Sequence, residues 1–327
     1  MKYILNFFLL FLATLEQDIE KKEGKKKNKI EEEKIVEKKY EELQKYRSPY
    51  QKSAPEPSLG GRVSSAFRNI KNLAVNAFDN TIGYPIAKYQ NYQTKEHFKG
   101  DPNSDKKLVY LMHGMFQNEG SQWRFGKQLK KSNYNPYHLK GHHHLELKKN
   151  ADKAFEQIKR LHKETKLKNA SQRKDYFSGH SSGGDVGLYM AGDERIRKYG
   201  IKEVQARAPA PYGIKAYTWP QKLLMPLVGE RGDLENKIAK REAVEMAHRE
   251  PRVNVHVVAG KYDRLVPPRD AVYMPKHPKI KHYVIEHKDS THFGTSGVNK
   301  GMNDIFVDLI KKGKEKYKPQ KYYKMAA

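Results

Sequence analysis

The sequence has no cysteine among its 327 residues. It therefore forms no disulfide bond, has no thiolate nucleophile and holds no metal through cysteine. Long apolar runs are also scarce, and the one near the N-terminus, from Tyr3 to Leu15, covers about 13 residues. That length fits a signal peptide and is short of the roughly 20 residues that span a bilayer. We expect residues 1–15 to be a signal-like or anchor segment, which favours a secreted or membrane-tethered protein over a cytoplasmic one.

Acidic residues are too few to balance the basic ones: 38 Asp and Glu stand against 64 Lys and Arg, a net charge of +26. Residues 1–60 carry only +2 of it, so +24 belongs to residues 61–327. A charge of this sign attracts polyanions, and an anionic membrane surface is one candidate partner. Nucleic acid is a weaker candidate, because the basic residues are dispersed and no nucleic-acid-binding motif is visible.

The composition changes near residue 60. Residues 16–48 are dominated by Glu and Lys, and the Pro- and Gly-containing segment from Ser48 to Gly61 ends any helix. We therefore expect residues 16–60 to be a charged helical or disordered linker, and residues 61–327 to form one domain.

Apolar residues return at helical spacing at the start of this domain. They are Val63, Phe67, Ile70, Ala74 and Phe78. Steps of three and four residues place them on one face of an amphipathic helix. We expect this face to cover part of the core, with membrane binding as the alternative.

Strand-like and helix-like segments then alternate. Strands are predicted at 108–112, 175–178, 204–208, 253–259 and 282–285, and helices at 150–164, 186–190 and 305–310, with Asn150 as the N-cap of the first. This order predicts an α/β fold with a mainly parallel, doubly wound sheet and helices on both faces. The apolar insert at 211–252 is a candidate for a small cap over the site, or for plain core packing.

A nucleophile elbow follows the predicted strand at 175–178. Residues 179–183 read Gly-His-Ser-Ser-Gly and fit G-x-S-x-G, which places Ser181 on a sharp turn between a strand and a helix. Ser182 is the alternative nucleophile. A serine nucleophile needs a histidine base that is oriented by a carboxylate.

Two later loops supply those partners. Asp263 follows the strand at 253–259, and His292 lies on the loop after the last predicted strand. The chain order of serine, acid and histidine is the one expected when the serine sits on such an elbow. Asp270 and Asp289 are alternative acids. Because parallel strands end at one edge of a sheet, these loops should meet there.

Four motifs together resemble the lipase/esterase branch of the α/β-hydrolase superfamily. They are Leu-Met-His-Gly at 111–114, the elbow, Gly-Lys-Tyr-Asp-Arg-Leu-Val-Pro at 260–267, and Thr-His-Phe-Gly at 291–294, within residues 107–312. The resemblance implies an α/β-hydrolase fold and backbone oxyanion donors at Ser182 and Met115, with Phe116 as the alternative to Met115. Candidate substrate contacts are His113, Gly114 and His180 within these motifs, and Tyr212 and Trp219 in the apolar insert at 211–252.

These residues predict a serine hydrolase that cleaves carboxylic esters, of small molecules or lipids, through an acyl-enzyme on Ser181. No metal and no organic cofactor are required. The run from His142 to His144 is interpreted as a solvated or gate-lining loop, because consecutive side chains point in different directions. The alternatives are a thioesterase, peptidase or acyltransferase on the same fold, and a non-catalytic module that binds polyanions.

Overall fold

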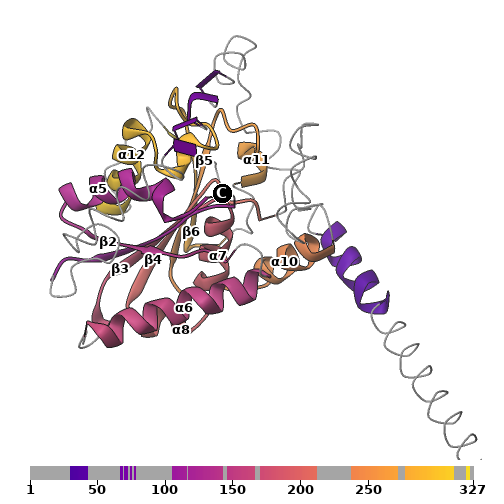
Figure 1. Cartoon of the computed structure of the whole chain (residues 1–327). Helices are drawn as coiled ribbons and strands as arrows, with labels where there is room; N and C mark the ends of the chain where they lie inside the picture. Colours follow the sequence, from indigo (N-terminus) through magenta and orange to yellow (C-terminus); the bar gives the residue numbers. More distant parts are fainter. Residues whose placement is uncertain are drawn as a thin grey trace, which may run out of the picture.

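A computed structural model describes the parts of the chain that carry the sheet, its covering helices and the loops between them. These are residues 30–42, most of 67–78, 105–142 except Phe116, 146–165, 170–211, 237–271, 277–312 and 322–324. Figure 1 shows a twisted sheet between two layers of helices. The expected signal-like segment, residues 1–15, lies outside the described residues.

The sheet has seven strands in the order β2-β1-β3-β4-β5-β6-β7. Their bounds are β1 Leu108–Met112, β2 Asn135–Leu139, β3 Asp175–His180, β4 Ile201–Arg207, β5 Asn254–Gly260, β6 Ile280–Ile285 and β7 Tyr322–Lys324. All neighbouring pairs are parallel except β6 and β7, which are antiparallel. The predicted fold class is confirmed, although the sequence did not predict β7.

Helices cover both faces of the sheet. The longer ones are α5 Trp123–Lys131, α6 Leu147–Glu164, α7 Ser182–Ala191, α10 Lys237–Ala247 and α12 Lys300–Lys312, and the short ones are α8 Arg195–Lys198 and α11 Pro268–Ala271. Alternate β1 residues face opposite layers: Tyr110 packs in the core cluster with α6 and α7, and Leu111 in the cluster with α5 and α12. A strand buried on both faces explains the uninterrupted apolar run in the sequence.

The start of α6 differs from the prediction. The helix begins at Leu147 after Glu146, and Asn150 is a fully buried interior residue rather than the N-cap. The side chain of Asn150 accepts a hydrogen bond from the backbone N–H of His142 at 3.0 Å, so it fastens the preceding loop to the helix. A buried glutamate on α10, Glu242, accepts from the Leu147 N–H and supplies the missing cap from outside the helix.

Only part of the expected cap insert is described. Its C-terminal part is α10, whose Met246 is buried in the main core cluster. This part of the insert therefore contributes to core packing, which was the alternative to a cap. Residues 212–236 lie outside the described residues.

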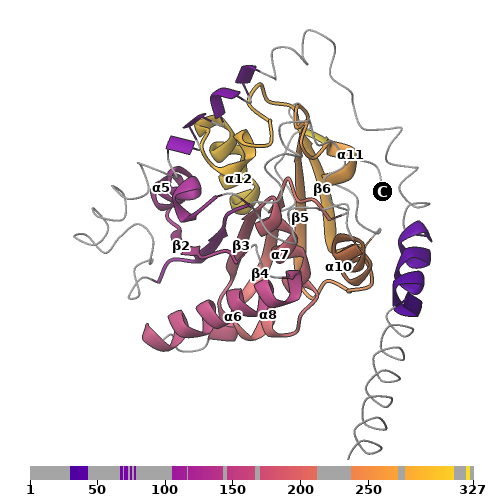
Figure 2. The same cartoon turned by 45° about the vertical axis from the view of Figure 1, so that its right-hand side comes forward.

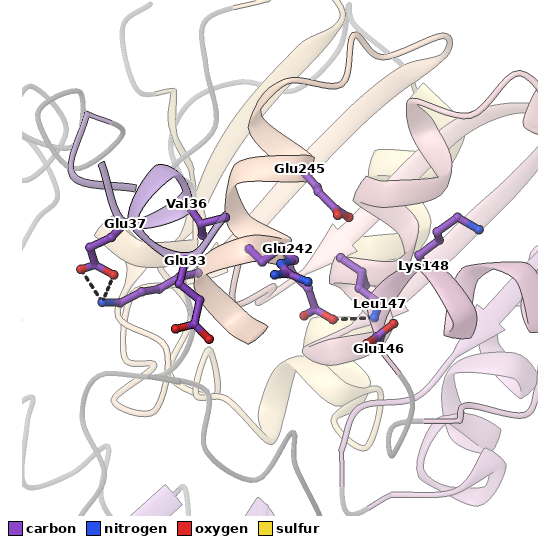
Figure 3. Close-up of a pocket in the computed structure, with 10 residues that line it drawn as sticks. Glu33, Val36, Glu37, Glu146, Leu147, Lys148, Glu242 and Glu245 are labelled. Carbon is purple, nitrogen blue, oxygen red and sulfur yellow. Dashed lines mark hydrogen bonds and ion pairs between the residues drawn. The ribbon is translucent and has the colours of Figure 1, made fainter. Parts of the chain in front are cut away.

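The charged linker contributes a helix over residues 30–42 that lies beside α10 (Figure 3). Lys240 of α10 donates to both carboxylate oxygens of Glu37, and Arg241 lies 3.7 Å from Glu32. Between the helix, α10 and the start of α6 is a hollow of about 420 Å³ with mostly charged lining residues. The contacts at the helix are ionic and partly exposed, so they hold it weakly.

The expected amphipathic helix also differs from the prediction. Residues 67–78 are helical wherever the structure describes them, but the side chains of Phe67, Ile70 and Phe78 are exposed. The buried residue is the polar Asn72. The apolar face thus does not cover the core, and the helix attaches to the domain through its other side. None of the helices in the described ranges has the length and apolar character needed to cross a bilayer.

Candidate active site

Ser181 occupies a strained turn between β3 and α7. Its φ of 52° and ψ of −125° lie in a region that residues other than glycine rarely adopt. The Ser181 N–H donates to the Arg207 carbonyl oxygen at 2.8 Å, and the Ser181 carbonyl oxygen accepts from the Asp185 N–H at 3.1 Å. These two bonds fix the turn, so that the hydroxyl stands at the carboxyl edge of the sheet.

The flanking glycines leave the elbow the space it needs. A Cβ atom on Gly179 would lie 2.0 Å from the Gly183 carbonyl oxygen. A Cβ atom on Gly183 would lie 2.5 Å from the carbonyl oxygens of both Met112 and His113. Because these neighbours are backbone atoms, they cannot move aside, and the turn requires glycine at both positions.

Ser181, His292 and Asp263 form one hydrogen-bonded chain. The Ser181 Oγ atom is 3.2 Å from His292 Nε2, and His292 Nδ1 is 2.9 Å from Asp263 Oδ2. A carboxylate only accepts hydrogen bonds, so Nδ1 carries the proton and Nε2 presents its lone pair to the serine hydroxyl. All three residues are buried. The structure thus brings together the three side chains that the sequence singled out.

The carboxylate of Asp263 is fixed by its own loop. Its second oxygen, Oδ1, accepts from the backbone N–H groups of Leu265 at 3.0 Å and Val266 at 2.8 Å. Of the alternative acids, Asp289 lies 3.9 Å from the ring of His287, and the carboxylate at His292 is that of Asp263. The oriented acid is therefore the one directly after β5.

The backbone of His292 is held by Thr295, which the sequence did not single out, and by His180, which was predicted for another role. The His292 carbonyl oxygen accepts from Thr295 Oγ1 at 2.6 Å and from His180 Nε2 at 2.9 Å. The three-residue spacing from His292 to Thr295 is typical of a local side-chain-to-backbone bond, and is the one signal that could have identified Thr295. The contact from His180 depends on tertiary structure and has no such signal.

His113 and His180 were predicted to contact substrate, and in the structure their ring nitrogens form hydrogen bonds with backbone groups. His113 Nε2 accepts from the Gly141 N–H at 3.1 Å, and Nδ1 donates to the Gly114 carbonyl oxygen at 2.9 Å. Burial lowers the pKa of His113. Burial also holds the pKa of His180 well below its ordinary value, with the charges of His292 and Arg207 acting in the same direction. Both rings are therefore neutral, and their hydrogen bonds hold backbone segments inside the protein.

The candidate oxyanion donors flank the elbow. Ser182 is the first residue of α7 and directly follows Ser181. Met115 follows Gly114 on the loop after β1, and a Cβ atom on Gly114 would lie 2.9 Å from that of Ser181. Gln117 shapes this loop, because its Oε1 atom accepts from the Gly114 N–H at 2.9 Å. The remaining candidates, Phe116, Tyr212 and Trp219, lie outside the described residues.

The histidine run is described only at its first residue. The backbone N–H of His142 donates to Asn150, and residues 143–144 lie outside the described residues. Within the part of the chain that the structure describes, no three His, Asp or Glu side chains are grouped as a metal site would need.

No protein-family model and no curated protein sequence is similar to this chain. Solved structures of similar fold include a mature lipase from Bacillus licheniformis, with 13% identity over 64% of this chain and 94% of the lipase, at a TM-score of 0.47. A putative aryl esterase from Burkholderia cenocepacia has 14% identity over 64% and 91%, at 0.46. A monoacylglycerol lipase from Paleococcus ferrophilus has 16% identity over 62% and 93%, at 0.42.

The fold follows from the chain's own topology. Six parallel strands with crossover helices carry a serine elbow between β3 and α7, an acid after β5 and a histidine after β6. The order of serine, acid and histidine on such a sheet is that of the α/β-hydrolases. The chain therefore has the α/β-hydrolase fold.

Proposed function

We propose that this protein is a serine hydrolase that cleaves carboxylic esters, with Ser181 as the nucleophile, His292 as the general base and Asp263 as the orienting acid. The observation that carries the proposal is the chain of hydrogen bonds from Ser181 Oγ through His292 to Asp263. A serine hydroxyl is a weak nucleophile alone, and this arrangement removes its proton as it attacks. The strained backbone of Ser181 supports the same conclusion, since strain of this kind gathers at functional sites.

In the first half of the reaction, Ser181 Oγ attacks the ester carbonyl carbon while its proton passes to His292 Nε2. The carbonyl oxygen becomes an oxyanion, which accepts hydrogen bonds from the backbone N–H groups of Ser182 and Met115, or of Phe116 in place of Met115. The carbon–oxygen bond to the alcohol then breaks, and His292 returns the proton to the departing oxygen. The products are the free alcohol and an acyl group on Ser181.

In the second half, a water molecule replaces the alcohol. His292 Nε2 takes a proton from the water, whose oxygen attacks the acyl carbon of the acyl-enzyme. The bond to Ser181 Oγ breaks, the serine recovers its proton from His292, and the carboxylic acid leaves. Asp263 stabilises the imidazolium form of His292 in both halves and keeps its own charge.

A fluorophosphonate probe tests the nucleophile, because such probes label only an activated serine. We expect the wild-type protein to be labelled on Ser181 and the Ser181→Ala variant to be unlabelled. Ser182→Ala is the matched control, since Ser182 lies next to Ser181 and is expected to act only through its backbone N–H. Labelling of Ser181→Ala but not of Ser182→Ala would transfer the role to Ser182. An unlabelled wild-type protein would favour the non-catalytic polyanion-binding module.

A substrate panel tests the reaction class. Matched esters, thioesters and amides with the same acyl group are offered to the wild type and to Ser181→Ala. We expect the highest kcat/KM for the ester and loss of turnover in the variant. A clear preference for the thioester or the amide would replace the esterase proposal by a thioesterase or a peptidase. Transfer of the acyl group to an added alcohol in preference to water would indicate an acyltransferase.

A further inference from the structure

The helix over residues 67–78 presents an apolar face to solvent. The side chain of Phe67 is 71% exposed, that of Ile70 is 64% exposed and that of Phe78 is 50% exposed, and Ala74 on the same face is exposed as well. Scattered apolar residues are normal on a protein surface, but a continuous helical stripe of them marks a binding surface. The apolar residues whose spacing predicted a buried helix face are thus exposed, and none of the described residues covers them.

The opposite side of this helix is attached to the loops of the candidate active site. The buried side chain of Asn72 donates to Thr291 Oγ1 at 3.2 Å, and Thr291 immediately precedes His292. The guanidinium of Arg68 lies 5.9 Å from the ring centre of Tyr262, which immediately precedes Asp263. Figure 2 shows the helix segments above α12 and beside the ends of the strands. The apolar face is therefore held next to the site and on its outer side.

The surroundings of this face are basic. Lys71 on the helix is exposed, as are Arg264 on the Asp263 loop and Lys288 on the His292 loop. Among the acidic residues of these loops, Asp263 and Asp270 are buried, Glu286 pairs with Lys261, and Asp289 lies 3.9 Å from the ring of His287. Exposed apolar and basic side chains along one helix, together with a net charge of +24 on residues 61–327, are complementary to an anionic lipid surface.

We propose that the face made by Phe67, Ile70, Ala74 and Phe78 docks on an anionic lipid–water interface and holds the active site against it. The apolar side chains enter the boundary between headgroups and acyl chains, and the basic side chains contact the headgroups. Docking in this position selects esters that are presented in such an interface. This substrate class rests on the proposed esterase function, whereas the docking itself does not.

Co-sedimentation of the full chain with vesicles tests the docking. The vesicles contain phosphatidylglycerol and phosphatidylcholine, or phosphatidylcholine alone. The test variant carries Phe67→Gln, Ile70→Gln and Phe78→Gln, which removes the apolar face and keeps residues that favour a helix. The matched control carries Ile30→Gln and Ile35→Gln, because these two side chains are also exposed on a helix but lie in the linker. Turnover of a dissolved short-chain ester and the unfolding midpoint are measured for every variant.

We expect the wild type to bind the anionic vesicles more tightly than the neutral ones. The affinity of the triple variant should fall at least about tenfold, since three large apolar side chains no longer enter the interface. The control variant should stay within about twofold of the wild type. The triple variant should keep the wild-type turnover of the dissolved ester and lose turnover of an ester embedded in the vesicles.

Three results would overturn the docking proposal. One is vesicle binding by the triple variant that equals that of the wild type, and another is an equal loss in the control variant. The third is a wild-type dimer that the triple variant cannot form, which would make the face a contact between two copies of the chain. Failure of the esterase proposal is distinguishable, because then the wild type hydrolyses neither ester although vesicle binding still depends on the apolar face.

Discussion

The Nε2 atom of His180 lies 2.9 Å from the backbone carbonyl oxygen of His292. His180 directly precedes the proposed nucleophile, Ser181, and His292 is the proposed base. The rings of these two histidines are 4.9 Å apart between centroids. A carbonyl oxygen only accepts, so His180 donates through Nε2. The elbow and the histidine loop are thus joined by a bond that bypasses the serine hydroxyl.

This bond predicts that His180 positions the base without touching the substrate. His180→Phe keeps a ring but removes the donor, and we expect kcat for a dissolved ester to fall about tenfold, as the loss of one buried hydrogen bond would cause. KM should change little. His180→Gln offers an amide N–H near the position of Nε2 and should recover most of the lost activity. A large rise in KM in both variants would instead indicate that His180 contacts the substrate.

The acid gives a second prediction. Asp263→Asn keeps the shape of the side chain and an oxygen for the N–H groups of Leu265 and Val266. It places an amide in front of His292 Nδ1 and no longer stabilises the tautomer that leaves Nε2 free. We expect kcat to fall by about 10⁴, the effect of this change in a Ser-His-Asp triad. The measurement is kcat with a dissolved ester, alongside Asp289→Asn, which should retain more than half of the activity.

The elbow glycines give a third prediction, on stability. The Cβ atom of Gly183→Ala would meet two backbone carbonyl oxygens at 2.5 Å, so we expect the free energy of unfolding to fall by at least about 2 kcal/mol. Gly184→Ala is the matched control on the same helix, because the atoms nearest to its Cβ would include the Pro209 Cβ at 3.2 Å and the Arg207 backbone nitrogen at 3.5 Å, without a backbone clash. The control should change stability by less than about 1 kcal/mol. Chemical denaturation measures both, and equal losses in the two variants would contradict the steric argument.

Local sequence was sufficient to predict the central elements of this fold. The run at 108–112 is apolar at every position because β1 is buried on both faces. The elbow motif is specific, because few sequences can form this sharp turn between a strand and a helix. Asp263 and His292 could be predicted because each follows a recognisable strand, and parallel strands bring such loops to one edge. The three side chains of the candidate site could therefore be predicted from local sequence, without knowledge of contacts between distant residues.

The errors concern features that depend on contacts distant in sequence. Asn150 has the residue type of an N-cap, but its side chain is used by the loop at His142, and Glu242 from another helix caps α6. The sequence also did not predict the hydrogen bonds that the rings of His113 and His180 form with backbone groups of other segments. Periodicity also cannot distinguish an apolar face that packs on a core from one that is exposed, as Phe67 and its neighbours illustrate.

The last prediction concerns acid stability and starts from His162 on α6. Burial, with a smaller contribution from the charge of Arg173, lowers the pKa of His162 from 6.5 to about 4. Burial raises the pKa of Tyr110 well above its usual value, so its hydroxyl stays protonated. This hydroxyl donates a hydrogen bond to His162 Nε2 at 2.7 Å. The folded protein thus holds this ring neutral, while the unfolded chain protonates it below about pH 6.5.

Between about pH 6.5 and 4, the unfolded chain therefore binds more protons at this site than the folded protein does, and the free energy of unfolding falls as the pH falls. Below about pH 4 the contribution of His162 no longer changes with pH.

His162→Gln keeps an acceptor for the Tyr110 hydroxyl and removes the titration. Urea denaturation between pH 4.5 and 7 should therefore show that the free energy of unfolding of the variant depends less steeply on pH. The slope keeps contributions from His113, His180 and His282, because burial also lowers their pKa values, that of His282 to about 4. A wild-type slope in His162→Gln would mean that the ring binds its proton equally well in the folded protein and in the unfolded chain.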